Sequence, residues 1–109
     1  MSHLSDLEIT RLCAEAMGLT VFWNEYLEVF QYTDEKTRMS NFYAPLADDA
    51  QAMAMAQRLR LWCCPTGEND WTVYDSIPGE ANVFVTTSSL NRAICECVAK
   101  FQQAKAATA

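Results

Sequence analysis

The 109 residues are enough for one hydrophobic core, so we expect a single domain over residues 1–109. Half of the residues are hydrophobic and 20% are charged, a globular composition that excludes general disorder and a membrane-spanning protein. Fourteen acidic residues against eight basic ones give a net charge of -6, which disfavours direct binding to the phosphate backbone of nucleic acids.

The cysteines and the first residues indicate a cellular compartment. Five cysteines are an odd number, and their spacing is not that of a secreted disulfide framework. The first ten residues have neither a basic flank nor a hydrophobic signal core, and no apolar run approaches the ~20 residues that span a bilayer. We therefore expect reduced thiols, a cytoplasmic location and no membrane contact.

A capping box predicts where the first helix begins. Ser5 and Glu8 have the S-x-x-E spacing in which each residue bonds to the backbone of the other. Apolar residues recur at helical spacing from Ile9 to Ala16, and Gly18 is suited to the left-handed position that ends a helix. The pattern predicts a helix with one buried face.

Two strands and a loop are expected next. Residues 19–23 and 27–32 are rich in β-branched and aromatic side chains and predict two strands or a hairpin. Residues 33–41 are polar and have no clear period, so we expect an exposed, mobile loop.

A second helix is expected from Asp48, the residue that caps it. Asp49 complements the positive end of the helix dipole, and Gln51 completes a D-x-x-Q capping box. This role explains the two aspartates better than metal binding does. The expected buried stripe consists of Ala52, Met55, Ala56 and Leu59.

Three strands and a last helix complete the chain. The strands are expected at residues 61–64, 71–75 and 81–87, and the short turns between them favour antiparallel pairing. Ser88 or Ser89 caps the helix that follows. The order of elements predicts an α/β protein of the α+β type: a three-layer α-β-α sandwich whose mainly antiparallel sheet of about 4 to 5 strands has helices on both faces.

The chain carries no residue pattern typical of a catalytic site. Its one histidine, His3, precedes the first helix, where it is poorly placed to activate a cysteine or serine. Neither neighbouring cysteine pair has the spacing of a metal corner, and the three glycines are too scattered for a phosphate-binding loop. We therefore expect no enzymatic activity, no catalytic residues, no metal and no cofactor.

Aromatic and arginine residues form the candidate ligand site. Core packing explains most of the aromatic rings, but aromatic faces beside guanidinium groups also suit a planar anion such as a nucleotide. The residues proposed for such a site are Tyr43, Arg58, Trp62, Trp71 and Arg92.

Two segments resemble a known family. They are Tyr43, Pro45, Leu46, Asp48, Asp49, Gln51, Ala52 and Met53 (YAPLADDAQAM), and Leu90, Asn91, Arg92, Ala93 and Ile94 (LNRAI). In these residues the chain resembles the phage α-β-α sandwich domain family, small bacteriophage and prophage proteins of unknown function. The resemblance implies the sandwich fold and a place in the host bacterial cytosol, but no catalytic residues. Residues 24–41 match no family pattern, so we expect any specific function there.

Two functions from different classes remain open. The first is a phage-encoded, non-enzymatic binding protein that contacts a host protein and modulates a host process, with counter-defence as the process considered first. The alternative is a sponge that sequesters a small nucleotide signal at the aromatic and arginine site, which we expect at an interface between copies of the chain.

Overall fold

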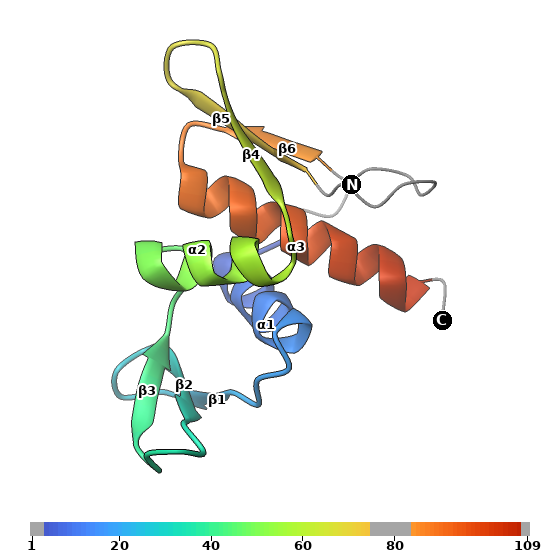
Figure 1. Ribbon diagram of the computed structural model, residues 1–109. Helices are drawn as coiled ribbons and strands as arrows, with labels where there is room; N and C mark the ends of the chain where they lie inside the picture. Colours follow the sequence, from blue (N-terminus) through green and yellow to red (C-terminus); the bar gives the residue numbers. More distant parts are fainter. Residues whose placement is uncertain (1–3, 75–83, 108–109) are drawn as a thin grey trace.

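The computed structural model describes residues 4–74 and 84–107, which form an α+β fold of three helices and two small antiparallel sheets (Figure 1). The elements in chain order are α1 (Asp6–Ala16), β1 (Phe22–Asn24), β2 (Val29–Thr33), β3 (Ser40–Tyr43), α2 (Asp49–Arg58), β4 (Trp62–Thr66), β5 (Asp70–Tyr74), β6 (Phe84–Thr87) and α3 (Leu90–Ala107). His3, the turn expected at residues 77–80, and residues 75 and 81–83 of the expected strands lie outside the described residues.

Helix α1 begins and ends as its sequence predicts. The Ser5 hydroxyl accepts a hydrogen bond from the Glu8 amide at 3.2 Å, and the Glu8 side chain completes the capping box. At the other end Gly18 has φ +72°, and its amide donates to the Glu15 carbonyl at 3.1 Å. The Leu19 amide donates to the Ala14 carbonyl at 2.9 Å, so the helix ends in a Schellman motif.

Helix α2 has the predicted cap but not the predicted capping box. Asp48 accepts hydrogen bonds from the amides of Ala50 and Gln51, as expected of an N-cap. The Gln51 side chain instead bonds to residues before the helix: it accepts from the Ala44 amide at 2.8 Å and donates to the Phe42 carbonyl at 2.7 Å. In a capping box the Gln51 side chain would accept from the Asp48 amide, but that amide already donates to the Ala44 carbonyl. The Gln51 side chain therefore ties α2 to β3 instead.

The loop expected at residues 33–41 is present but shorter, over residues 34–39, because its two ends belong to strands. Thr33 ends β2, residues 34–39 form a turn, and Ser40 begins β3. Asp34 closes this turn, because its amide donates to the Met39 carbonyl at 2.9 Å and its carbonyl accepts from the Arg38 amide at 2.7 Å. These bonds convert a polar segment without any periodic pattern into the connection of a β-hairpin.

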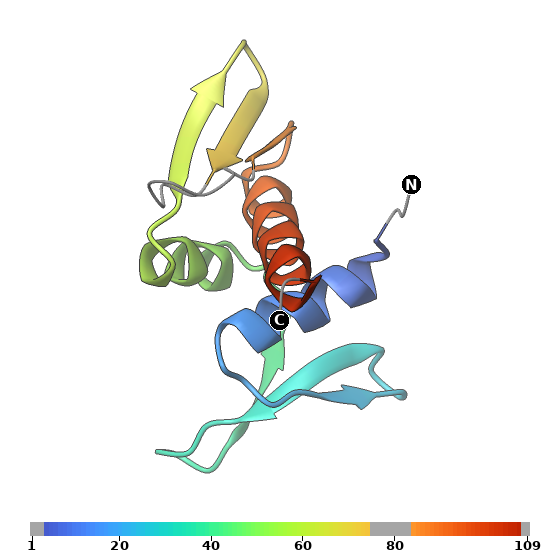
Figure 2. The ribbon, with the colours of Figure 1, turned by 90° about the vertical axis from the view of Figure 1, so that its right-hand side faces the viewer.

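The described residues form two sheets where we expected one. Sheet A has the order β1-β2-β3 and sheet B the order β4-β5-β6, each with three antiparallel strands. The helices lie between the two sheets, and sheet A extends away from them (Figure 2). The expected single sheet with helices on both faces is therefore not present. Strands β3 and β4, which α2 separates in the chain, do not pair with each other.

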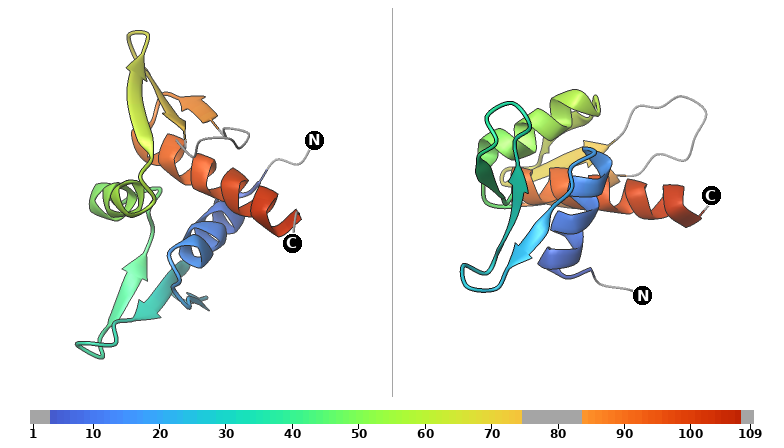
Figure 3. Two further views of the ribbon diagram at one scale, coloured as in Figure 1. Left: turned by 45° about the vertical axis from the view of Figure 1, so that its right-hand side comes forward. Right: turned by 90° about the horizontal axis from the view of Figure 1, so that it is seen from below.

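Helix α3 is the centre of the hydrophobic core. It packs against α1 and α2 and also against β5 and β6 (Figure 3). Ile94, Met55 and Val73 are fully buried, one each from α3, α2 and β5. Ile94 is thus a core residue, whereas Leu12 and Leu59 are only half-buried against the core.

Candidate functional site

The five residues proposed for a ligand site lie in separate parts of the fold. Tyr43 ends β3 with only 4% of its surface exposed, so it belongs to the core. Its ring meets that of Tyr32 edge to face at 6.1 Å, and its hydroxyl reaches the Met55 sulfur at 4.0 Å. Burial raises the pKa of the Tyr43 phenol. This ring cannot stack on a ligand unless the core opens.

Trp62 and Trp71 lie on opposite faces of sheet B. Trp71 shares its face of β5 with Val73, which is fully buried, and it packs against the core beneath α3. Trp62 pairs with Tyr74 on the other face, where the two rings stack at 6.1 Å with an interplanar angle of 5°. Trp62 is 53% exposed. No single ligand can contact both tryptophans across the sheet.

Arg92 has a structural role that its sequence context did not indicate. One guanidinium nitrogen lies 3.0 Å from a carboxylate oxygen of Asp6, and another lies 3.0 Å from Glu96 one turn further along α3. The hydrogen bond to Asp6 is the main reason why the pKa of Arg92 is raised. Because both carboxylates already neutralise Arg92, it is a poor receptor for a phosphate group.

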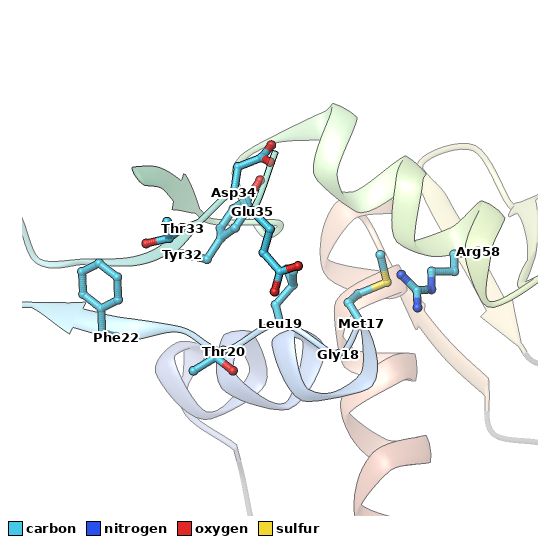
Figure 4. Close-up of a pocket in the computed structure, with 10 residues that line it drawn as sticks. All are labelled: Met17, Gly18, Leu19, Thr20, Phe22, Tyr32, Thr33, Asp34, Glu35 and Arg58. Carbon is cyan, nitrogen blue, oxygen red and sulfur yellow. The ribbon is translucent and has the colours of Figure 1, made fainter. Parts of the chain in front are cut away.

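Arg58 borders a groove in the described part of the chain. A groove of about 730 Å³ lies between the end of α1, sheet A and the last residue of α2 (Figure 4). It is lined by Met17, Gly18, Leu19, Thr20, Phe22, Tyr32, Thr33, Asp34, Glu35 and Arg58. None of the other four proposed residues lines this groove. The structure therefore does not bring the predicted site together.

Sheet A exposes an aromatic surface that the sequence analysis missed. In its register Phe22 lies opposite Gln31, and Gln31 lies opposite Phe42, so these three side chains form a row on one face. We call this row the outer face of sheet A. Phe22 is 47% exposed and Phe42 is 55% exposed. The opposite face carries Tyr43 and contacts the core.

The alternation of side chains in residues 22–24 and 29–33 could have indicated this face. In residues 29–33 the rings of Phe30 and Tyr32 are at even positions only, but Phe22 and Trp23 are neighbours, which predicts an apolar side chain on each face of that strand. Since a small sheet has only one face to bury against a core, the other face must remain exposed in the isolated chain.

The buried cysteines are structural side chains in this fold. The Cys13 thiol, fully buried on α1, donates to the Cys95 carbonyl of α3 at 3.5 Å. Hydrogen bonding with Cys95 and burial raise the pKa of Cys13 well above its usual range. A thiol held in its neutral form is a poor nucleophile and a poor metal ligand. Within residues 4–74 and 84–107, no three His, Cys, Asp or Glu side chains lie where they could hold a metal ion.

The comparisons with known proteins leave the family open. No family model matches the chain, and neither a curated protein nor a solved structure matches it. The resemblance to the phage α-β-α sandwich family therefore stays a hypothesis that rests on the two segments quoted above. None of the helices in the described part of the chain is long and apolar enough to cross a membrane.

Proposed function

We propose that this chain is a phage-encoded, non-enzymatic binding protein that contacts a host protein through the outer face of sheet A and thereby modulates a host process. The phage origin and the host cytosol rest on the sequence resemblance, and counter-defence is the first process to test. The outer face of sheet A supports a protein partner, because exposed aromatic rings on a rigid strand are typical anchors of protein interfaces.

The observation that carries the proposal is where the exposed hydrophobic side chains are concentrated. Nine large hydrophobic side chains are exposed in the described residues, and six of them belong to sheet A and its two turns. They are Phe22 and Phe42 on the outer face, Trp23 on the opposite face, and Tyr26, Leu27 and Met39 in the two turns. Single exposed hydrophobic residues are normal on a protein surface, but a local concentration marks an interaction site. Three of the six, Tyr26, Leu27 and Met39, lie within residues 24–41, where a specific function was expected, and the other three flank this segment.

The alternative, a nucleotide sponge, has weaker support from the geometry. Of its five residues, Tyr43 and Trp71 pack against the core and Arg92 is paired with two carboxylates. Arg58 borders a groove, but Asp34 and Glu35 line the same groove and repel phosphate groups. We therefore favour the protein partner and keep the nucleotide as a second arm of the test.

The test is capture of a host protein by the purified chain, with two matched variants. Phe42 and Trp62 are exposed to nearly the same degree, 55% and 53%, and lie in different sheets. Phe42→Thr should weaken binding roughly thirtyfold, the effect of losing an interface anchor, whereas Trp62→Thr should leave binding unchanged. Equal capture by both variants would refute a contact through sheet A. Calorimetric binding of a nucleotide, lost in Arg58→Gln, would favour the alternative instead.

A further inference from the structure

The groove beside sheet A has the size and lining of a binding site. Its volume of about 730 Å³ lies within the ~300 to 1,000 Å³ that is usual for ligand pockets. Met17, Leu19, Phe22 and Tyr32 give it apolar walls, and Glu35 and Arg58 add opposite charges (Figure 4). Phe22 also belongs to the outer face of sheet A, so the groove adjoins the proposed interface.

The two charges are not used within the described part of the chain. Neither the Glu35 carboxylate nor the Arg58 guanidinium makes a hydrogen bond or an ion pair with another described residue, although both residues line the same groove. In Figure 4 the Glu35 carboxylate points toward Leu19, and the Arg58 guanidinium lies beside Met17. A partner can therefore bind to either group without first breaking an existing ion pair.

The backbone holds the walls of the groove in place. The Asp34 carboxylate accepts hydrogen bonds from the amides of Lys36 at 2.8 Å and Thr37 at 3.4 Å, which fixes the turn that presents Glu35. Gly18 ends α1 in its Schellman motif. The end of α2 is similar, because the Leu61 amide donates to the Ala56 carbonyl at 2.9 Å. A preorganised site loses less entropy when it binds a partner.

We propose that this groove binds a short peptide segment of the partner protein in which a lysine or arginine lies beside an apolar residue. The proposal rests on the proposed function, since it names what part of a partner would contact the chain. Two carboxylates, Asp34 and Glu35, outnumber the one guanidinium of Arg58, and the whole chain has a net charge of -6. Charge complementarity therefore favours a basic segment.

The chemistry of the lining assigns a part of the segment to each wall. The cation pairs with Glu35, and its methylene stem packs on the ring of Tyr32. The neighbouring apolar side chain packs against Met17 and Leu19. Arg58 donates hydrogen bonds to a backbone carbonyl of the segment, since a guanidinium is a donor only.

The first test titrates the isotopically labelled chain with two octapeptides, acetylated and amidated, and follows the NMR signals of the groove. One peptide carries a lysine flanked by leucines, and the other carries glutamate in place of the lysine. We expect the lysine peptide to shift the Gly18 and Glu35 amides and the Arg58 side chain, and the glutamate peptide to shift none of them. The proposal is overturned if the groove signals stay unchanged at millimolar lysine peptide, or if both peptides shift them equally.

Glu35→Gln and Glu25→Gln form a matched pair for the second test. Both residues are exposed and both changes remove one negative charge, but Glu25 lies in the turn before β2 and does not line the groove. Glu35→Gln should weaken the lysine peptide roughly tenfold, as expected when a hydrogen bond to a charged group is lost. Glu25→Gln should change its affinity less than twofold. Equal effects of the two changes would mean that only the net charge attracts the peptide.

The same variants separate this inference from the proposed function. If host-protein capture is lost in Phe42→Thr but unchanged in Glu35→Gln, sheet A binds the partner and the groove inference is wrong. If capture is weakened in both variants, both proposals are supported. If neither variant affects capture, the proposed function is refuted, and the peptide titration alone decides whether the groove binds a basic segment.

Discussion

Tyr43 provides the sharpest test of the core, because two substitutions distinguish its ring from its hydroxyl. An aromatic side chain buries ~150 to 250 Å². At ~25 cal/mol per Å² this area corresponds to about 4 to 6 kcal/mol, which is an upper figure. Tyr43 is 4% exposed, so Tyr43→Ala should lower the free energy of unfolding by about 3 to 5 kcal/mol. Its hydroxyl reaches only a sulfur atom at 4.0 Å, so Tyr43→Phe should cost less than about 1 kcal/mol.

Urea denaturation followed by circular dichroism measures both values. A small domain has only about 5 to 15 kcal/mol of stability, so Tyr43→Ala can fail to fold. Tyr43→Leu, which keeps much of the buried volume, then serves as the second variant and should cost less than Tyr43→Ala. A Tyr43→Ala midpoint equal to that of the parent would remove the ring from the core. A loss above about 2 kcal/mol in Tyr43→Phe would show that the hydroxyl has a stronger partner than Met55.

Four further substitutions test the stability of the fold. Ile94→Ala should cost about 2 to 5 kcal/mol, because the side chain is fully buried on α3, and an unchanged urea midpoint would contradict this. Arg60, two residues beyond the end of α2, has φ +55°, so Arg60→Gly should raise the free energy of unfolding by about 0.5 to 1 kcal/mol. Gly18 has φ +72° and open space around an added methyl group, so Gly18→Ala should lower the free energy of unfolding by about 1 kcal/mol. Thermal melts in which Arg60→Gly and Gly18→Ala change the stability in the same direction would refute the strain argument. Because the pKa of Cys13 is raised in the folded chain, its neutral thiol contributes stability that is fully present below the usual thiol pKa of 9.0 and is lost as the pH rises above that value. Cys13→Ser should therefore flatten the fall in urea midpoint between about pH 8 and pH 10.5, and an unchanged slope would contradict this.

The candidate site was predictable only in part. Arg58 was singled out as a guanidinium group expected beside aromatic rings, and it borders the groove instead. Trp71 and Tyr43 were singled out as aromatic residues, but the fold uses both in packing. Residue type alone cannot distinguish these outcomes, because the same ring serves a core or a binding surface. The side that a ring faces depends on strand register, which the sequence analysis did not assign.

Local signals in the sequence determined the helix ends. Ser5, Glu8 and Gly18 act on backbone groups within five residues of themselves, so α1 can be predicted without knowing anything else about the fold. The same holds for Asp48 at the start of α2. Gln51 shows the limit of this reasoning, since a tertiary partner on β3 replaced the local one.

Pairings between distant residues were decided only by the tertiary structure. Apolar periodicity shows that a strand has a face to bury, but not which strand lies beside it or which helix covers it. The strands consequently form two sheets, with α1 and α3 packed together between them, where the order of elements had suggested one. The groove exists because residues of α1, sheet A and α2 meet there, so Glu35 and Arg58, 23 positions apart in the chain, line one cavity.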